Sequence, residues 1–147
     1  RLEQLIIKQA KNKNQKFNDL FFNIKNSIPA KRFAKPDVGT STGASGDAIY
    51  TVPAGAGSTA LESIIIGISI CNKNSSERTV GIFLDNEDGS NDAYIVNGLK
   101  VPGNTTVEIM QGNKIVVQND GSNADVIRAE ASAGSSIDVV LSVLEDV

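Results

Sequence analysis

The sequence predicts an all-β protein, an antiparallel β-sandwich of the immunoglobulin-like or jelly-roll kind, with a helical arm at its N-terminus. Three observations lead to this expectation. Apolar residues recur at helical spacing up to residue 28, apolar and polar residues alternate beyond residue 48, and turn-forming clusters separate the alternating runs. The length of 147 residues leaves room for one ordinary core and an appendage.

Residues 1–34 form the predicted basic, amphipathic arm. Its apolar stripe, the expected protein interface, contains Leu5, Ile6, Phe17, Leu20, Phe21 and Ile24. Residues 11–14, with the sequence Lys-Asn-Lys-Asn, interrupt the stripe, so one broken helix and two helices both remain open. Pro29 is the expected helix stop. Because an isolated helix of this length is marginal in water, we expect the stripe to bind the sandwich, copies of itself or another protein.

Residues 35–48 are predicted to be a flexible linker. They are rich in Gly, Ser and Thr and carry few large side chains that could offset the entropy of ordering. The segment should therefore tether the arm to the sandwich without belonging to either.

The sandwich is predicted to occupy residues 49–147. Eight strands are expected, at residues 49–52, 61–71, 79–84, 93–96, 105–110, 114–117, 125–131 and 137–144. In the second strand, alternation predicts one inward face made by Ile64, Ile66, Ile68 and Ile70. Other strands should add matching inward residues: Val80, Ile82, Leu84, Val107, Ile109, Ile127, Ala129, Ala131, Ile137, Val139, Leu141 and Val143.

Charge is distributed unevenly along the chain. Residues 1–35 hold nine Lys or Arg against two acids, whereas residues 36–147 hold five Lys or Arg against fifteen acids. The first part therefore has a net charge of +7 and the second a net charge of -10. A charged arm of this kind usually meets a partner that the body would repel. The lysines could contact nucleic-acid phosphates, but the apolar stripe favours docking on protein.

The composition argues against catalysis and against a membrane span. The sequence contains no His and no Trp, so it lacks the commonest general base and metal ligand, and we expect no enzymatic activity and no cofactor. Cys71 is the single cysteine, which excludes an intrachain disulfide. No apolar run approaches the roughly 20 residues of a membrane helix. Because the chain begins at Arg1, we expect residues upstream of it, and no signal-peptide layout follows.

One acidic loop, at residues 85–92, is a candidate for calcium binding. Its carboxylates come from Asp85, Glu87, Asp88 and Asp92. Aligning Gly89 with the glycine of an EF-hand loop would place Leu84 at the first ligand position, where a carboxylate is required. The register therefore favours a solvated hairpin tip, with calcium as the open alternative.

The sandwich section resembles a group of small β-sandwich proteins among the virion structural proteins of tailed bacteriophages. The segments that carry the resemblance are 50–55 (YTVPAG), 70–72 (ICN), 93–96 (AYIV), 101–103 (VPG), 112–115 (GNKI) and 141–145 (LSVLE). The resemblance implies a capsid-decoration, neck or tail-fibre module, often trimeric and attached by one terminus. It does not extend over residues 1–35. The sequence Gln118-Asn119-Asp120 also departs from the Gly-Asp turn expected there, which leaves the subfamily open.

Together these observations predict a non-enzymatic structural component of a tailed-phage virion, anchored through its N-terminal arm. The expected partners are capsid, portal, neck or tail proteins and copies of the chain itself, with no membrane contact and with nucleic acid disfavoured. The expected location is the virion, assembled in the host cytoplasm. The alternative is a carbohydrate- or receptor-binding module of a fibre, against which the aromatic fraction of 5% counts.

Overall fold

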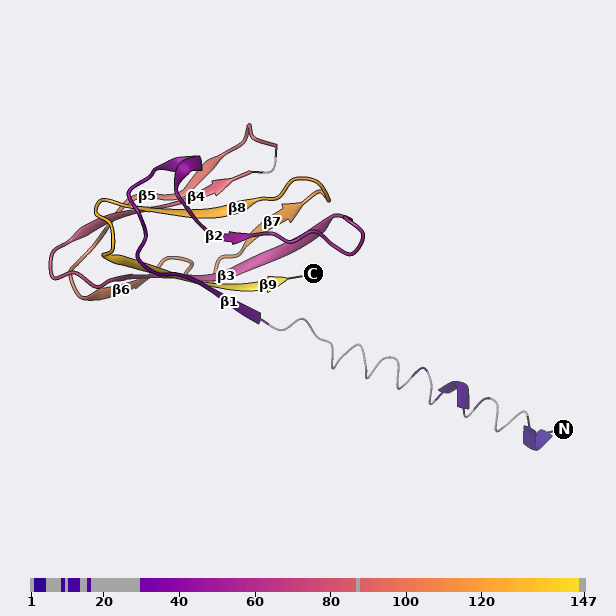
Figure 1. Cartoon of the computed structure of the whole chain (residues 1–147). Helices are drawn as coiled ribbons and strands as arrows, with labels where there is room; N and C mark the ends of the chain where they lie inside the picture. The colour runs from indigo at the N-terminus through magenta and orange to yellow at the C-terminus, as the bar shows by residue number, and fades with distance from the viewer. Residues whose placement is uncertain are drawn as a thin grey trace.

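The computed structural model describes residues 2–4, 9, 11–13, 16, 30–86 and 88–145. Within residues 30–86 and 88–145 it contains nine strands and one short 3-10 helix, shown in Figure 1. In chain order they are β1 (Ala30–Lys35), η1 (Gly43–Ser45), β2 (Asp47–Thr51), β3 (Leu61–Asn72), β4 (Arg78–Asp85), β5 (Ala93–Val101), β6 (Thr105–Glu108), β7 (Ile115–Asn119), β8 (Val126–Ala131) and β9 (Ile137–Glu145).

The strands form two antiparallel sheets, seen as two layers in Figure 1. Sheet A has the order β1-β9-β3-β6, and β7 also pairs with β3. Sheet B has the order β2-β8-β4-β5. Since β9 occupies one edge of β3, β6 and β7 follow one another along its other edge. The prediction of an all-β fold with two packed sheets is confirmed.

The strands pair in the order of one long hairpin folded over on itself. At its closed end β4 pairs with β5, and the successive outer pairs are β3 with β6 and β7, β2 with β8, and β1 with β9. Consecutive strands therefore lie in different sheets almost throughout. As a consequence, the start of β1 and the end of β9 are neighbours at one end of the sandwich, with Ala30 opposite Leu144.

All eight predicted strands are present, with ends shifted by a few residues, but β1 was not predicted. The assignment of residues 30–34 to the helical arm is wrong, because Ala30–Lys35 is a strand along the edge of β9. The sequence of β1 shows no clear alternation of apolar and polar residues, because the inward side carries two lysines, Lys31 and Lys35, besides Phe33. The Phe33 ring packs on Tyr50, with ring centroids 4.6 Å apart. The described residues of 1–29 are helical, and the rest of the arm lies outside the described residues, so the helical arm stays a prediction.

The prediction of a flexible linker at residues 35–48 is also wrong. Val38 has no exposed surface and belongs to the core. Its N–H donates to the carbonyl of Ile137 at 2.9 Å, and the carbonyl of Gly39 accepts from the N–H of Ala131 at 2.9 Å. The small residues around Val38 order because neighbouring strands and carboxylates satisfy their backbone groups, including the Gly39 N–H, which donates to Asp47 Oδ2 at 2.7 Å.

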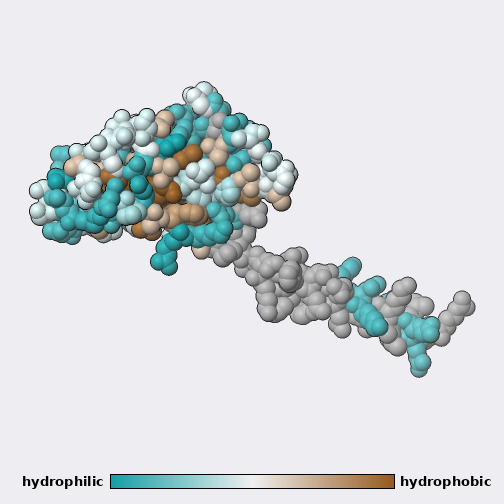
Figure 2. Space-filling model, viewed as in Figure 1, coloured by the Kyte–Doolittle hydropathy of each residue, from teal (hydrophilic) through white to brown (hydrophobic). Residues whose placement is uncertain are grey.

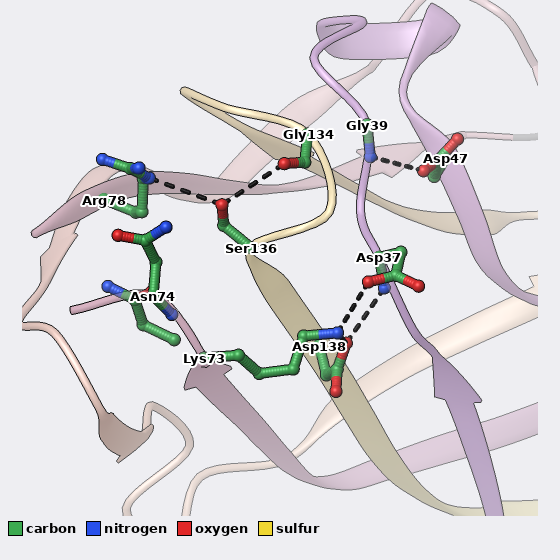
Figure 3. A network of polar contacts seen from close by, with 10 residues as sticks. Asp37, Gly39, Asp47, Lys73, Asn74, Arg78, Gly134, Ser136 and Asp138 are labelled. Carbon is green, nitrogen blue, oxygen red and sulfur yellow. Dashed lines mark hydrogen bonds and ion pairs between the residues drawn. The ribbon is translucent and has the colours of Figure 1, made fainter. Parts of the chain in front are cut away.

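An ion-pair network holds the start of this segment against sheet A (Figure 3). Lys73 Nζ lies 2.6 Å from Asp37 Oδ1 and 2.8 Å from Asp138 Oδ1, and these two carboxylates raise the pKa of the Lys73 ammonium. The Asp37 N–H also donates to Asp138 Oδ1 at 2.9 Å. Lys73 and Asp138, far from Asp37 in sequence, thus hold the segment that connects β1 in sheet A to β2 in sheet B.

The core lies between the sheets, and Figure 2 shows hydrophobic atoms gathered in a band between the two layers. Most inward residues predicted outside β3 are buried as expected: Val80, Ile82, Ile127, Ala129, Ala131, Ile137, Val139, Leu141 and Val143. Three others, Leu84, Val107 and Ile109, are only partly buried and pack against the core from its margin. The face prediction for β3 is half wrong, because its register to β9 shifts between Ile65 and Gly67. Ile68 and Ile70 point inward, but before this bulge Ser63 and Ile65 do so, and Ile64 and Ile66 lie on the outer face.

Candidate protein-binding surface

The outer face of sheet A carries a row of apolar side chains across four strands. Val116 of β7 lies opposite Ile64 of β3, Ile64 lies opposite Leu144 of β9, and Leu144 lies opposite Ala30 of β1. Val116 is 53% exposed, and Ile64 and Leu144 are partly exposed. We call these four residues the apolar row. It lies where the chain leaves the N-terminal segment and enters the sandwich, because Ala30 is the first residue of β1.

Small side chains border the apolar row. The next cross-strand set pairs Gly67 of β3 with Ser142 of β9, and Ser69 pairs with Val140 beyond it. Ile66, the bulged residue of β3, adds a further partly exposed apolar side chain. The outer face of sheet A therefore has short side chains on this side of the apolar row, whereas the exposed Glu62 of β3 and Gln118 of β7, which are hydrogen-bonded to each other, flank its other side.

Charges of opposite sign stand on the two sides of this face. Arg32 on β1 is exposed, and its side chain makes no hydrogen bond or ion pair among the described residues. Glu108 on β6 is exposed and accepts from the Ile68 N–H at 2.9 Å and from Ser69 Oγ at 2.6 Å. Partial burial opposes its ionisation, but these hydrogen bonds hold the pKa of the Glu108 carboxyl below its usual value. The β1 side thus carries the basic Arg32, whereas the β6 and β7 side carries one charge of each sign, Glu108 and the exposed Lys114.

A buried polar cluster fixes the strands at the end where β1 begins. Tyr50 Oη donates to Ser63 Oγ at 2.9 Å, and Lys31 forms an ion pair with Glu145, whose exposure is only 8%. Burial raises the pKa of the Tyr50 hydroxyl, and the nearby Glu145 carboxylate raises it further. These contacts join β1 to β9 and β2 to β3 at the end of the sandwich where β1 begins.

The acidic loop at residues 85–92 directs its described carboxylates to separate partners. Asp85 Oδ2 accepts from Arg128 Nε at 2.7 Å, and Asp92 Oδ1 accepts from the Asn86 N–H at 2.9 Å. Asp88 Oδ1 accepts from the Ser90 N–H at 2.7 Å, which lowers the pKa of the Asp88 carboxyl. Glu87 lies outside the described residues. Among the described residues no group of three His, Cys, Asp or Glu converges on one point.

A shallow groove of about 250 Å³ lies on sheet B, beside the segment before η1. Its polar lining consists of Thr40, Thr42, Thr79, Asn97, Glu130 and Ser132. Glu130 is held in place, because its Oε2 accepts from the Gly43 N–H at 2.7 Å and from Tyr94 Oη at 3.1 Å. The groove offers hydroxyl, amide and carboxylate groups to a polar ligand.

The predicted interface on the arm cannot be placed, since Leu5, Ile6, Phe17, Leu20, Phe21 and Ile24 lie outside the described residues. The apolar row was not predicted from sequence, because Ile64 was assigned to the core face. A signal was present, however. The run Ile64-Ile65-Ile66 places large apolar side chains on both faces of β3, which a strand with one solvated face does not need.

Comparison with known proteins gives no identification: no protein family, curated protein or solved structure matches this chain. In the described part of the chain, no helix has both the length and the apolar character that a bilayer crossing requires.

Proposed function

We propose that this chain is a non-enzymatic structural protein that assembles with other proteins through the outer face of sheet A and through its N-terminal arm. The observation that carries the proposal is the apolar row, which lies on the outside of a sheet beside the attachment point of the arm. Contiguous apolar patches are uncommon on the surface of monomeric proteins and mark interaction sites. Full burial of one such side chain contributes roughly 1.5–3 kcal/mol before association costs.

The particle we propose is a tailed-phage virion, in which the chain decorates the capsid, neck or tail. The support is the resemblance of its strand and turn segments to virion structural proteins, together with the opposite charges of residues 1–29, which sum to +4, and of residues 30–147, which sum to -7. The pairing order of the strands favours the jelly-roll form of sandwich over the immunoglobulin-like form, since eight strands paired as one folded hairpin make the two Greek keys of a jelly roll. In this count β6 and β7 are one edge strand.

Anchoring by the arm is tested with Leu20→Asp combined with Phe21→Asp in the full chain. The expected result is loss of incorporation into particles, with the melting temperature of the sandwich unchanged, because two charges on the stripe oppose its burial. Asn23→Asp with Asn26→Asp is the matched control, since it makes the same charge change away from the stripe. Normal incorporation of the stripe variant would refute anchoring by the arm.

A second candidate function is binding of a carbohydrate or polar receptor group, which the groove beside Glu130 favours. Its hydroxyl and amide groups suit sugar hydroxyls, although no aromatic residue lines it. Titration of the full chain with oligosaccharides, followed by NMR, should shift the signals of Thr42 and Asn97 in the wild type and not in Glu130→Gln. Unchanged spectra across a panel of glycans would remove this candidate.

A further inference from the structure

Asn97 and Gly98 of β5 form the one Asn-Gly sequence of the chain. We infer that Asn97 is a site of spontaneous modification, at which the folded protein converts the side-chain amide into a carboxylate without an enzyme. The product is a mixture of aspartate and isoaspartate at position 97. This inference goes beyond the proposed assembly function and does not depend on it.

The reaction needs only the chain and water. The backbone nitrogen of Gly98 attacks Cγ of Asn97, so that an N–Cγ bond forms, the Cγ–Nδ2 bond breaks, and ammonia leaves with the proton of the Gly98 nitrogen. The result is a cyclic succinimide. Water then opens the ring at either of its carbonyl carbons, which gives aspartate or isoaspartate. Glycine hinders this attack least, since it has no Cβ beside the nitrogen.

The structure leaves this pair of residues accessible and outside regular pairing. Asn97 and Gly98 are both exposed, and β5 is an edge strand of sheet B. The register of β5 to β4 shifts here, so that the two residues together face the single residue Gly81, and a bulge of this kind disrupts the hydrogen-bond ladder. The side-chain amide of Asn97 makes no hydrogen bond to another described residue. Nothing among those residues therefore holds Cγ of Asn97 away from the Gly98 nitrogen.

Asp88 and Gly89 can form the same cyclic intermediate, but the fold holds them differently. The N–H of Gly89 donates to the carbonyl of Asn86 at 2.9 Å, so the nitrogen that would attack is already engaged. Oδ1 of Asp88 accepts from the N–H of Ser90 at 2.7 Å and from the N–H of Asn91 at 3.1 Å. These bonds hold the pKa of the Asp88 carboxyl below its usual value, and an ionised carboxylate is a poor target for a nucleophile.

Asp120 and Gly121, the second Asp-Gly sequence, repeat this arrangement. The N–H of Gly121 donates to Oδ1 of Asn119 at 2.8 Å. Oδ1 of Asp120 accepts from the N–H groups of Asn123 and Ser122, each at 2.7 Å, and these bonds lower the pKa of the Asp120 carboxyl. Of the three sites, all within the described residues, only Asn97 thus combines exposure with a side chain that no hydrogen bond holds.

The modification changes the groove on sheet B, because Asn97 and Glu130 both line it. Glu130 is the only charged side chain of that lining, so the reaction adds a second carboxylate to it. The isoaspartate form also lengthens the backbone of β5 by one carbon atom. Since β5 has a strand on one side only and is already bulged at this point, the sandwich can accommodate the extra atom.

The first test is incubation of the full wild-type chain for several days in mildly alkaline buffer, followed by trypsin digestion and mass spectrometry. The fragment 79–100 contains Asn97 and should gain one mass unit there, because an NH2 group is replaced by OH. Asn113, which is also exposed but is followed by Lys114, is the internal control in fragment 101–114 and should react at least about 10-fold more slowly, since Lys114 carries a Cβ. An unmodified Asn97 in the folded chain, or equal rates at Asn97 and Asn113, would overturn the inference.

Gly98→Ala tests the attacking residue. The rate at Asn97 should fall at least about 10-fold, since the added Cβ hinders the nitrogen. Because alanine is strained at the φ of 67° that Gly98 adopts, the two proteins are compared both in buffer and in urea, where the strain is absent. An unchanged rate in urea would contradict attack by the Gly98 nitrogen.

The last test asks whether the fold selects the site. Isoaspartate is measured at positions 88, 97 and 120 by labelling with an isoaspartate-specific methyltransferase, in buffer and in urea. We expect isoaspartate at position 97 alone in the folded chain and at all three positions in urea, where the hydrogen bonds of the two Asp-Gly turns are lost. Equal isoaspartate at positions 88 and 97 of the folded chain would refute the selection of Asn97 by the fold.

Discussion

Val38→Ala tests whether residues 35–48 are part of the folded domain. Val38 has no exposed surface and packs in the core, whereas a side chain in a flexible linker would contact nothing. The substitution removes two methyl groups at roughly 0.8 kcal/mol each and leaves a small cavity, so we expect the free energy of unfolding to fall by about 2–3 kcal/mol. The main-chain hydrogen bond from Val38 to Ile137 remains, so the loss reports side-chain packing alone.

The measurement is urea unfolding of both proteins, followed by far-UV circular dichroism. Val116→Ala is the matched control, because it deletes the same atoms from a side chain that is 53% exposed. It should change the free energy by less than about 0.5 kcal/mol under conditions where the chain is monomeric. For a domain of this size the Val38 variant should also melt about 10 °C lower. Equal stabilities of the two variants would show that residues 35–48 do not contribute to the core.

Three further changes probe polar groups. Asn72 is fully buried and its Nδ2 donates to three carbonyls at 2.9–3.2 Å, so Asn72→Leu should cost about 3–5 kcal/mol in calorimetry; a near-neutral result would show that water replaces the amide. Burial raises the pKa of Tyr50 above the value of 10 in the unfolded chain, so stability is present below pH 10 and falls as the pH rises above it. Tyr50→Phe should reduce this loss of stability at alkaline pH, measured as the urea midpoint at each pH. Equal changes of the midpoint with pH in the wild type and the variant would contradict the assignment of the loss to Tyr50. Although burial opposes it, the Lys73 ammonium and the Asp37 N–H hold the pKa of Asp138 below its usual value, so stability is present above about pH 4 and falls with pH below that value. Asp138→Asn should weaken this fall of stability at acid pH. An unchanged pH midpoint of acid unfolding in the variant would refute the role of Asp138.

Most of the sandwich could be predicted from local pattern. Strands β8 and β9 alternate with period two between clear turn residues, and their inward side chains are the ones expected. Such patterns suffice because one face of each strand is buried and the other partly exposed, so burial directly shapes the order of residues.

The candidate site could not be predicted, because it depends on a bulge. A shift of one residue moves every following side chain of a strand to the other face. The bulge between Ile65 and Gly67 therefore places Ile64 outside and Ile68 inside, although both lie on one face in a regular strand. The run of isoleucines is compatible with either register, and only pairing with β9 and β7 selects one.

The sequence by itself determined the fold class, the positions of eight strands, the absence of histidine and the opposite charges of arm and body. Only the tertiary structure decided that residues 30–48 belong to the sandwich, because they are ordered by partners more than 80 residues away. These partners are β9 for β1, Ile137 for Val38, and Ala131 for Gly39. It also decided which isoleucines reach the surface. Local sequence specifies what a segment can form, whereas hydrogen bonds and burial supplied by distant strands specify what it does form.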